Sequence, residues 1–474
     1  MPKAPRATGP KGAPAKTQEP EEHALSGWGR TSPTTAALIA PDEEADIFGS
    51  VLGAAAGSRR GVIARGLGRS YGDAAQCAGG VVVDTKNLGR IGPIDPDTGV
   101  LDVGAGVSLD SLLRAGLQSG WFLPVSPGTR QVTIGGAIAA DIHGKNHHAD
   151  GSFCRHVSSV TLATPTGVHE VSPDNDPELF WATAGGMGLT GIVTSARVSM
   201  RKVETSWMRV DTERHDDLDS LMEGLERVDR LSRYSVAWVD CGAAGSKLGR
   251  GLLDAGDHAG VSELPAKRKD DPLAPPRRGL KMPSLVPPGL VNPLTVAAFN
   301  EAWFRKSPSR TGRLRHLGGF FHPLDAVSNW NLVFGRRGFV QYQFAVPDAQ
   351  RGVVGQAIEI LQEAGAPCTL AVLKRFGPED PGPLSFPIPG WTLALDLPVG
   401  PPGLRSALRR LDGIVAGAGG RVYLAKDARL EPTRFAAMYP RLDEFNLVRR
   451  RVDPEGMLQS DLARRLGICE DPRP

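Results

Sequence analysis

Residues 65–73, RGLGRSYGD, combine three glycines with two arginines directly after the apolar run 61–64. Glycines lack a Cβ atom, so they allow positive φ angles and let successive main-chain N–H groups point toward one place. A concave row of N–H donors beside arginine side chains can hold a pyrophosphate. The segment is therefore predicted to be a strand that runs into a phosphate-binding loop.

Three other interpretations of this loop are weighed against that one. The dinucleotide fingerprint G-x-G-x-x-G must open a helix, but residues 74–80 leave no room for a helix before the next strand, 81–84. The string Gly68–Gly72 also matches the G-x-S-x-G nucleophile elbow around Ser70, which needs a helix at the same place. A plain surface loop is the third possibility.

Two further glycine-rich segments, residues 126–148 and 184–193, decide between these alternatives. Glycines at 128, 135, 136 and 144 allow a close approach of the main chain to a large flat ligand, and the small residues 137–140 leave room for it. Three such loops in one region favour a cofactor that lies extended along the protein and is contacted by the main chain at many points.

These segments carry a family resemblance. The strings RGLGRSYGDAAQ, PVSPGTRQVTIGGAIAADIHGKNHH, GGMGLTGI, GFVQYQF, PLSFPIPGW and LAKDAR resemble the FAD-binding oxidoreductases of the vanillyl-alcohol-oxidase type. Within that group the chain is similar, from about Trp28 to Ile468, to the flavoprotein subunits of decaprenylphosphoryl-β-D-ribose 2-epimerases. The implied fold class is α+β, with an FAD-binding domain of the PCMH type and a substrate domain whose antiparallel sheet is covered by helices.

The resemblance implies FAD as cofactor and a set of residues that contact it. These are Arg65, Gly66, Leu67, Gly68, Arg69, Ser70, Tyr71, Gly72, Asp73, Gly128, Thr129, Thr133, Ile134, Gly135, Gly136, Ala140, His143, Gly144, Lys145, Asn146, Val193 and Tyr423. Many relatives attach FAD covalently through a histidine in the first loop, where this chain has Arg69, Ser70 and Tyr71. Non-covalent FAD is therefore predicted.

The implied reaction is oxidation of the 2-hydroxyl of a polyprenylphosphoryl-β-D-ribose to the 2-keto intermediate, the first half of an epimerisation that gives the arabinose donor for cell-wall arabinan. The catalytic candidates are Lys426, Tyr71 and His143, and Lys426 is either the base or a stabiliser of the developing alkoxide. The substrate candidates are Lys145, Gln341, Gln343, Lys374 and Lys426. Thr392 and Ala394 replace an Asn and a Cys of many mycobacterial members, which leaves the lipid and the sugar open.

Four other functions stay open at this point. A soluble sugar-alcohol or aldonolactone oxidase belongs to the same superfamily, and a serine hydrolase would use Ser70. A flavin-binding partner of a reductase would bind FAD without catalysis. A zinc site at His143, His147 and His148 is disfavoured, because Gly144 between them makes a shared helix unfavourable and no glutamate follows the first histidine.

The implied partners are the lipid substrate and a separate NADH-dependent keto-reductase. No nicotinamide fingerprint is seen in this chain, and a formal charge of +3 does not indicate nucleic acid. The basic, proline-rich loop at about 264–292 is predicted to be mobile and solvated, and contact with an anionic membrane surface is the alternative. The sequence has neither a secretory h-region nor an apolar run of membrane-spanning length, so the predicted location is cytoplasmic or peripheral at the membrane, with the cell-envelope side implied by the resemblance.

Length and patterning set the elements that must position these residues. The 474 residues, 41% of them hydrophobic, suit two domains, and five scattered cysteines indicate neither a disulfide framework nor a metal site. The predicted division is a disordered tail (1–26), an FAD-binding part (27–203), a substrate domain (204–420) and a return to the FAD-binding domain (421–474). Amphipathic helices are predicted after the N-cap Ser108, at 349–364 and at 403–417, and the strand 339–344 places Gln341 and Gln343 on one face.

Overall fold

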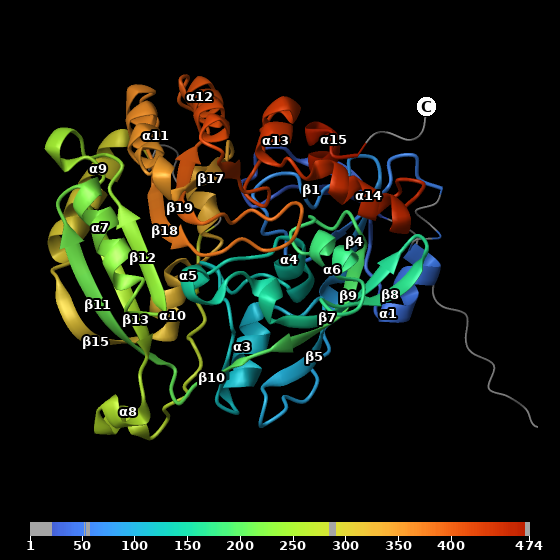
Figure 1. The fold of residues 1–474 in the computed structure, drawn as a ribbon, viewed down its shortest axis with the longest axis horizontal. Helices are drawn as coiled ribbons and strands as arrows, with labels where there is room; N and C mark the ends of the chain where they lie inside the picture. Colours follow the sequence, from blue (N-terminus) through green and yellow to red (C-terminus); the bar gives the residue numbers. More distant parts are fainter. Residues whose placement is uncertain (1–20, 52, 54–56, 284–290, 470–474) are drawn as a thin grey trace, which may run out of the picture.

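A computed structural model describes residues 21–51, 53, 57–283 and 291–469. Figure 1 shows two parts that lie side by side, one built on a large sheet and one on smaller sheets. This arrangement confirms the predicted α+β class with an FAD-binding part beside a helix-covered sheet.

The first small sheet supports the start of the glycine loop. Its order is β1 (Glu21–Leu25), β2 (Thr34–Ile39), β4 (Val81–Asp84) and β3 (Val62–Arg65). Strands β2, β4 and β3 are parallel, and β4 is buried along its whole length, as β-branched residues covered on both faces predict. Strand β1 corrects the predicted tail of residues 1–26, because residues 21–25 pair antiparallel with β2; residues 1–20 lie outside the described residues.

A second four-stranded sheet, wholly antiparallel, lies below the pocket elements. Its order is β5 (Val100–Gly104), β9 (Ile192–Ser199), β7 (Val157–Thr164) and β8 (Gly167–Val171). Three helices accompany it, α3 (Leu109–Leu117), α4 (Ile134–Ala139) and α6 (Pro177–Thr183), together with the short pair β6 (Trp121–Phe122) and β10 (Arg201–Lys202). The predicted N-cap of α3 is confirmed, since Ser108 accepts a hydrogen bond from the Ser111 N–H at 3.0 Å.

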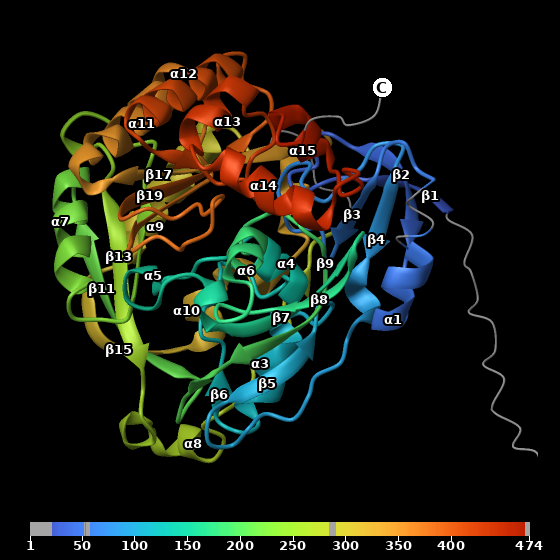
Figure 2. The ribbon, with the colours of Figure 1, turned by 45° about the vertical axis from the view of Figure 1, so that its right-hand side comes forward.

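The large sheet has eight antiparallel strands. Their order is β15 (Arg310–His316), β11 (Trp207–His215), β13 (Gly251–His258), β12 (Tyr234–Val239), β18 (Leu370–Phe376), β19 (Gly390–Pro398), β17 (Phe339–Pro347) and β20 (Arg421–Val422). Helices α7 (Leu218–Val228), α11 (Gly352–Glu363) and α12 (Leu404–Gly417) cover its outer face (Figures 1 and 2). In β17, Tyr342 is buried on the helix side, whereas Gln341 and Gln343 reach the pocket on the opposite side, as the alternation predicts.

The chain returns to the first part after β20. Helices α13 (Pro432–Met438), α14 (Leu442–Val452) and α15 (Asp461–Leu466) lie near the N-terminal strands in Figure 2. Arg465 on α15 ties the return to the glycine loop, because its guanidinium pairs with Asp73 at 2.7 Å and with Asp427 at 2.8 Å. The domain boundaries themselves stay a prediction.

The predicted loop at 264–292 is structured in part. It contains α8 (Ala266–Lys269) and β14 (Leu280–Lys281), which pairs with β16 (Val327–Ser328), while residues 284–290 lie outside the described residues. The remaining helices are α1 (Glu44–Asp46), α5 (His147–Asp150), α9 (Pro293–Lys306) and α10 (Leu317–Phe321). Within the described ranges, none of the helices has the length and apolar character that crossing a bilayer requires.

Candidate active site

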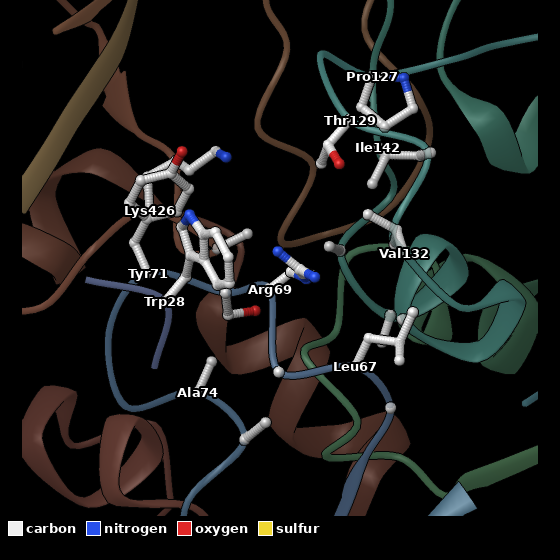
Figure 3. A pocket seen from close by; sticks show the side chains of 18 of the residues that line it. Trp28, Leu67, Arg69, Tyr71, Ala74, Pro127, Thr129, Val132, Ile142 and Lys426 are labelled. Atoms are coloured by element: carbon white, nitrogen blue, oxygen red, sulfur yellow. The ribbon is translucent and has the colours of Figure 1, made fainter. Parts of the chain in front are cut away.

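One elongated pocket lies between the glycine loops and the large sheet (Figure 3). The loop after β3, the 126–133 loop with α4, and residues 187–193 form one wall, and strands β17, β18 and β19 with the segment after β20 form the other. Predicted residues that line it are Gly66, Leu67, Gly68, Arg69, Ser70, Tyr71, Gly128, Thr129, Thr133, Gly135, Gly136, Ala140, His143, Val193, Gln341, Gln343, Lys374, Tyr423 and Lys426. The three glycine segments therefore meet at one cavity.

The first loop offers an anion a row of main-chain donors. In the described structure, the N–H groups of residues 67–70 donate no hydrogen bond to a protein acceptor, and all four residues line the pocket. Gly68 has a φ of +62°, which turns the chain at this point. A Cβ on Gly66 would lie 2.1 Å from Thr133 Oγ1, so this position requires glycine for packing. Unpaired, converging N–H groups fit the pyrophosphate of a dinucleotide cofactor.

Arg69 adds a positive charge to the same wall. Its guanidinium carbon lies 3.8 Å from the Trp28 ring centroid, and Figure 3 shows the two side chains together with Tyr71 and Lys426 along one side of the pocket. Arg69 Nε is buried without a hydrogen-bond partner in the described residues. Burial lowers the pKa of Arg69 and Asp325 opposes that shift. An arginine held in this way is ready to bind an anionic group.

Lys426 and Tyr71 form the proton-handling end of the pocket. Lys426 Nζ lies 4.1 Å from the Tyr71 ring centroid, and in the described structure it has no hydrogen-bond acceptor. Burial lowers the pKa of Lys426 to about 8, an effect that the Asp396 carboxylate partly offsets. Burial raises the pKa of Tyr71 well above its usual range, so its phenol stays protonated. A lysine whose pKa is close to neutral pH can exchange a proton with a bound hydroxyl group.

Asp396 is linked to Tyr71 through Gln341. Gln341 Nε2 donates to Asp396 Oδ1 at 2.5 Å and to the Tyr71 hydroxyl at 3.2 Å. The Asp396 side chain is buried, with 2% exposure, and burial raises its pKa to about 7. Asp396 is thus a buried carboxyl group whose negative charge raises the pKa of the nearby Lys426.

His143 belongs to a second network on the same sheet face. Lys374 Nζ lies 3.0 Å from His143 Nδ1, and Gln343 Nε2 lies 2.9 Å from His143 Nε2. Gln343 Nε2 also donates to Thr392 Oγ1 at 3.1 Å. Burial, with Lys374 and other nearby cations, holds the pKa of His143 well below its usual range. Burial and the neighbouring cations Lys145 and Lys426 also lower the pKa of Lys374 to about 7. His143 is therefore a neutral, hydrogen-bonding group.

Some predicted cofactor residues do not line the pocket. They are Arg65, Gly72, Asp73, Ile134, Gly144, Lys145 and Asn146. Arg65 donates instead to the Ser26 carbonyl at 2.7 Å, and Asp73 pairs with Arg465. Lys145, predicted for both cofactor and substrate, donates to the Phe320 carbonyl at 2.5 Å. A role for these seven residues in holding the cofactor stays a prediction.

The structure gives no support to the zinc and hydrolase alternatives. Within the described residues, no group of His, Cys, Asp and Glu could hold a metal ion, and His147 Nδ1 accepts from the Gly377 N–H at 3.1 Å. Turns rather than a helix follow Ser70, and its hydroxyl makes no hydrogen bond to a histidine in that part of the chain. A nucleophile elbow requires a helix directly after the serine and a histidine that binds the serine hydroxyl.

Four residues at the site were not predicted from the sequence: Trp28, Trp330, Leu324 and Asp396. The first three line the pocket from segments distant in sequence, and no local pattern marks them. Asp396 had a usable signal, because in β19 it shares the face of Thr392 and Ala394 by the two-residue period. It lies directly opposite Gln341 in the strand register.

Comparisons with known proteins agree with this geometry. Residues 35–172 match the FAD binding domain family, and residues 402–466 match the D-arabinono-1,4-lactone oxidase family. The chain is 46% identical to decaprenylphosphoryl-β-D-ribose oxidase of Mycolicibacterium smegmatis over 94% of this chain and 97% of that protein. It is 42% identical to an uncharacterised protein of Streptomyces coelicolor over 76% of this chain and the whole of that protein. L-gulono-1,4-lactone dehydrogenase of Mycobacterium tuberculosis is 24% identical over 93% of this chain and 98% of that protein.

Proposed function

The chain belongs to the decaprenylphosphoryl-β-D-ribose oxidase family of FAD-dependent oxidoreductases, and on that premise we propose that it oxidises the 2-hydroxyl of a polyprenylphosphoryl-β-D-ribose to the 2-keto compound. The observation that carries the proposal is Lys426, a buried lysine with a pKa of about 8 in the glycine-lined pocket. Its Nζ has no acceptor among the described residues and is available to a substrate hydroxyl.

The residues divide the work as follows in the proposed reaction. When bound, FAD supplies the acceptor for the hydride that leaves the alcohol carbon. Lys426 takes the hydroxyl proton, so the alcohol loses one proton and one hydride and becomes a ketone. Gln341 and Gln343 orient the sugar hydroxyls from β17, and Lys374 pairs with the phosphate. The main chain of residues 67–70 and Arg69 hold the cofactor pyrophosphate.

We expect the FAD to be bound without a covalent link. The first glycine loop carries neither histidine nor cysteine, and His143 is already engaged by Lys374. Trichloroacetic acid precipitation should therefore give a colourless pellet and a yellow supernatant. A pellet that keeps the flavin colour would contradict this prediction.

Replacing Asp396 should move the pH dependence of the reaction. The Asp396 carboxylate raises the pKa of Lys426, so Asp396→Asn is expected to lower that pKa below about 8. More Lys426 is then neutral at a given pH, and the rise of kcat/KM with pH should shift to lower pH by roughly one unit, which corresponds to about 1.4 kcal/mol. A pH profile that coincides with that of the wild type would remove Asp396 from the network.

The product of this step is a ketone, and epimerisation requires its reduction from the other face. We assign that step to a separate NADH-dependent keto-reductase, and the pair would supply the arabinose donor for cell-wall arabinan. The lipid substrate favours a peripheral position at the membrane, with contact in or near the basic segment 264–292. No role with nucleic acid is proposed.

An anaerobic absorbance titration of the purified protein with polyprenylphosphoryl ribose tests the proposed function. Bleaching of the flavin band in proportion to added substrate is the expected result. An unchanged spectrum with saturating substrate would contradict it, and ribose without the lipid phosphate is the matched control.

A second candidate is a sugar-alcohol or aldonolactone oxidase that acts on soluble substrates. The match of residues 402–466 to the D-arabinono-1,4-lactone oxidase family favours it, because this segment includes Lys426. Turnover of water-soluble polyols or lactones with release of peroxide would support this candidate over the first.

A further inference from the structure

Helix α9 (Pro293–Lys306) is attached to the large sheet mainly through polar groups. Asn300 is buried, and its Nδ2 donates to Asp240 Oδ1 at 2.8 Å. Glu301 pairs with Arg250 at 2.5 Å, and Arg250 pairs with Asp240 at 2.8 Å. Phe304 adds one buried ring beneath the Arg250 guanidinium. A hydrogen-bonded ion network thus fixes which face of α9 is turned inward.

The outward face of α9 is apolar. Phe299 is 57% exposed and Trp303 is 48% exposed. Phe299 and Trp303 lie one turn apart and stack with parallel rings, 6.1 Å between centroids. Surface helices of globular proteins normally turn their apolar stripe toward the core. An exposed aromatic pair held outward by buried polar anchors is a mark of an interaction surface.

Basic residues follow this apolar face in the sequence. Lys306 ends α9, and the next strand, β15, carries Arg310 and Arg313 at the open edge of the large sheet, as Figure 1 shows for the strand. All three side chains are exposed, and none has a carboxylate partner in the described part of the chain. Glu301, the acidic residue of α9, is already paired with Arg250 and Arg305. These three cations are therefore available to an anionic partner.

We propose that the outward face of α9 and the basic edge of β15 form a docking surface for an anionic lipid bilayer, here called the α9 surface. Aromatic and aliphatic side chains enter the interface region of a membrane while neighbouring cations meet lipid phosphates. The choice of a bilayer as occupant rests on the function proposed above, because a polyprenyl phosphate is held in a membrane. The surface itself rests on the exposure and charge of α9.

Co-sedimentation of the flavin-loaded protein with vesicles tests this proposal. Vesicles of phosphatidylcholine with phosphatidylglycerol in a two-to-one ratio should bind the wild type, and phosphatidylcholine alone should bind it weakly. Phe299→Ser combined with Trp303→Ser should weaken binding about tenfold or more through the loss of buried apolar area. Arg310→Glu combined with Arg313→Glu should weaken it too and flatten its salt dependence.

Leu447→Ser is the matched control, because Leu447 on α14 is an exposed apolar residue, 64% exposed, outside the α9 surface. It should bind vesicles as the wild type does, and bound flavin together with circular dichroism establishes the fold of every variant. Equal binding by the wild type and the aromatic variant would overturn the proposal. The proposal would also be overturned if the wild type did not bind vesicles and instead formed a dimer or a reductase complex that the aromatic variant could not form.

Failure of the proposed function would be seen separately. Vesicle binding is measured without substrate, and oxidation of substrate in detergent micelles is measured without a bilayer. The aromatic variant should keep the micellar activity of the wild type. If the protein binds vesicles but does not oxidise the substrate, the proposed docking role of the α9 surface stands and only the proposed reaction is contradicted.

Discussion

Lys426→Ala is expected to keep FAD bound and to lose reduction of the flavin by substrate. A positioned general base contributes about 10²- to 10⁴-fold to a rate, and a pKa of about 8 suits Lys426 to that role near neutral pH. Tyr71 cannot replace it, because burial raises the pKa of its phenol well above the usual range. Cofactor binding should persist, since the main-chain donors of residues 67–70 are untouched.

Anaerobic stopped-flow absorbance measures this effect directly. Lys247→Ala, which removes an exposed lysine outside the pocket, should reduce the flavin at the wild-type rate. A normal rate for Lys426→Ala would exclude the lysine from the chemistry. A colourless Lys426→Ala protein would make it a cofactor ligand, and the base would then have to be sought elsewhere in the pocket.

The glycine loops and the β17 alternation could be predicted because each is a local pattern. Residues 66–71 and the pair Gln341 and Gln343 reach the pocket as their spacing indicates. Arg65 and Arg69 show where local patterns end. They flank the same glycines, yet Arg65 donates a hydrogen bond to the Ser26 carbonyl, whereas Arg69 faces the pocket and stacks on the Trp28 ring. The turn at Gly68 separates them, and no spacing rule gives its direction.

Long-range packing explains the other differences. Lys145 and Lys374 are both predicted to bind the substrate. Lys145 instead donates to the Phe320 carbonyl, whereas Lys374 lines the pocket. Asp396 matters because strand register places it opposite Gln341. Register of a strand that begins far along the chain is a property of the folded sheet, so its consequence for Lys426 is seen only in the structure.

The second large effect is expected from Gly128→Leu, which should give a folded protein that binds FAD poorly. Gly128 lines the pocket, and a Cβ at this position would meet nothing within 4 Å. The leucine therefore fits the protein without a clash and adds bulk at the pocket wall, where we expect the cofactor to lie. Overpacking of this kind costs about 1–3 kcal/mol, which is about 5- to 150-fold in Kd.

Gly352→Leu separates loss of cofactor space from loss of fold. A Cβ at Gly352 likewise meets nothing within 4 Å, but this residue lies at the exposed start of α11, outside the pocket. Fluorescence titration of the apoproteins with FAD should give a wild-type Kd for Gly352→Leu and a raised Kd for Gly128→Leu, with equal circular dichroism for both. An unchanged affinity of Gly128→Leu for FAD would mean that the cofactor does not lie beside residue 128. The assignment of residues 67–70 to its pyrophosphate would then fail too, because both loops line the same pocket.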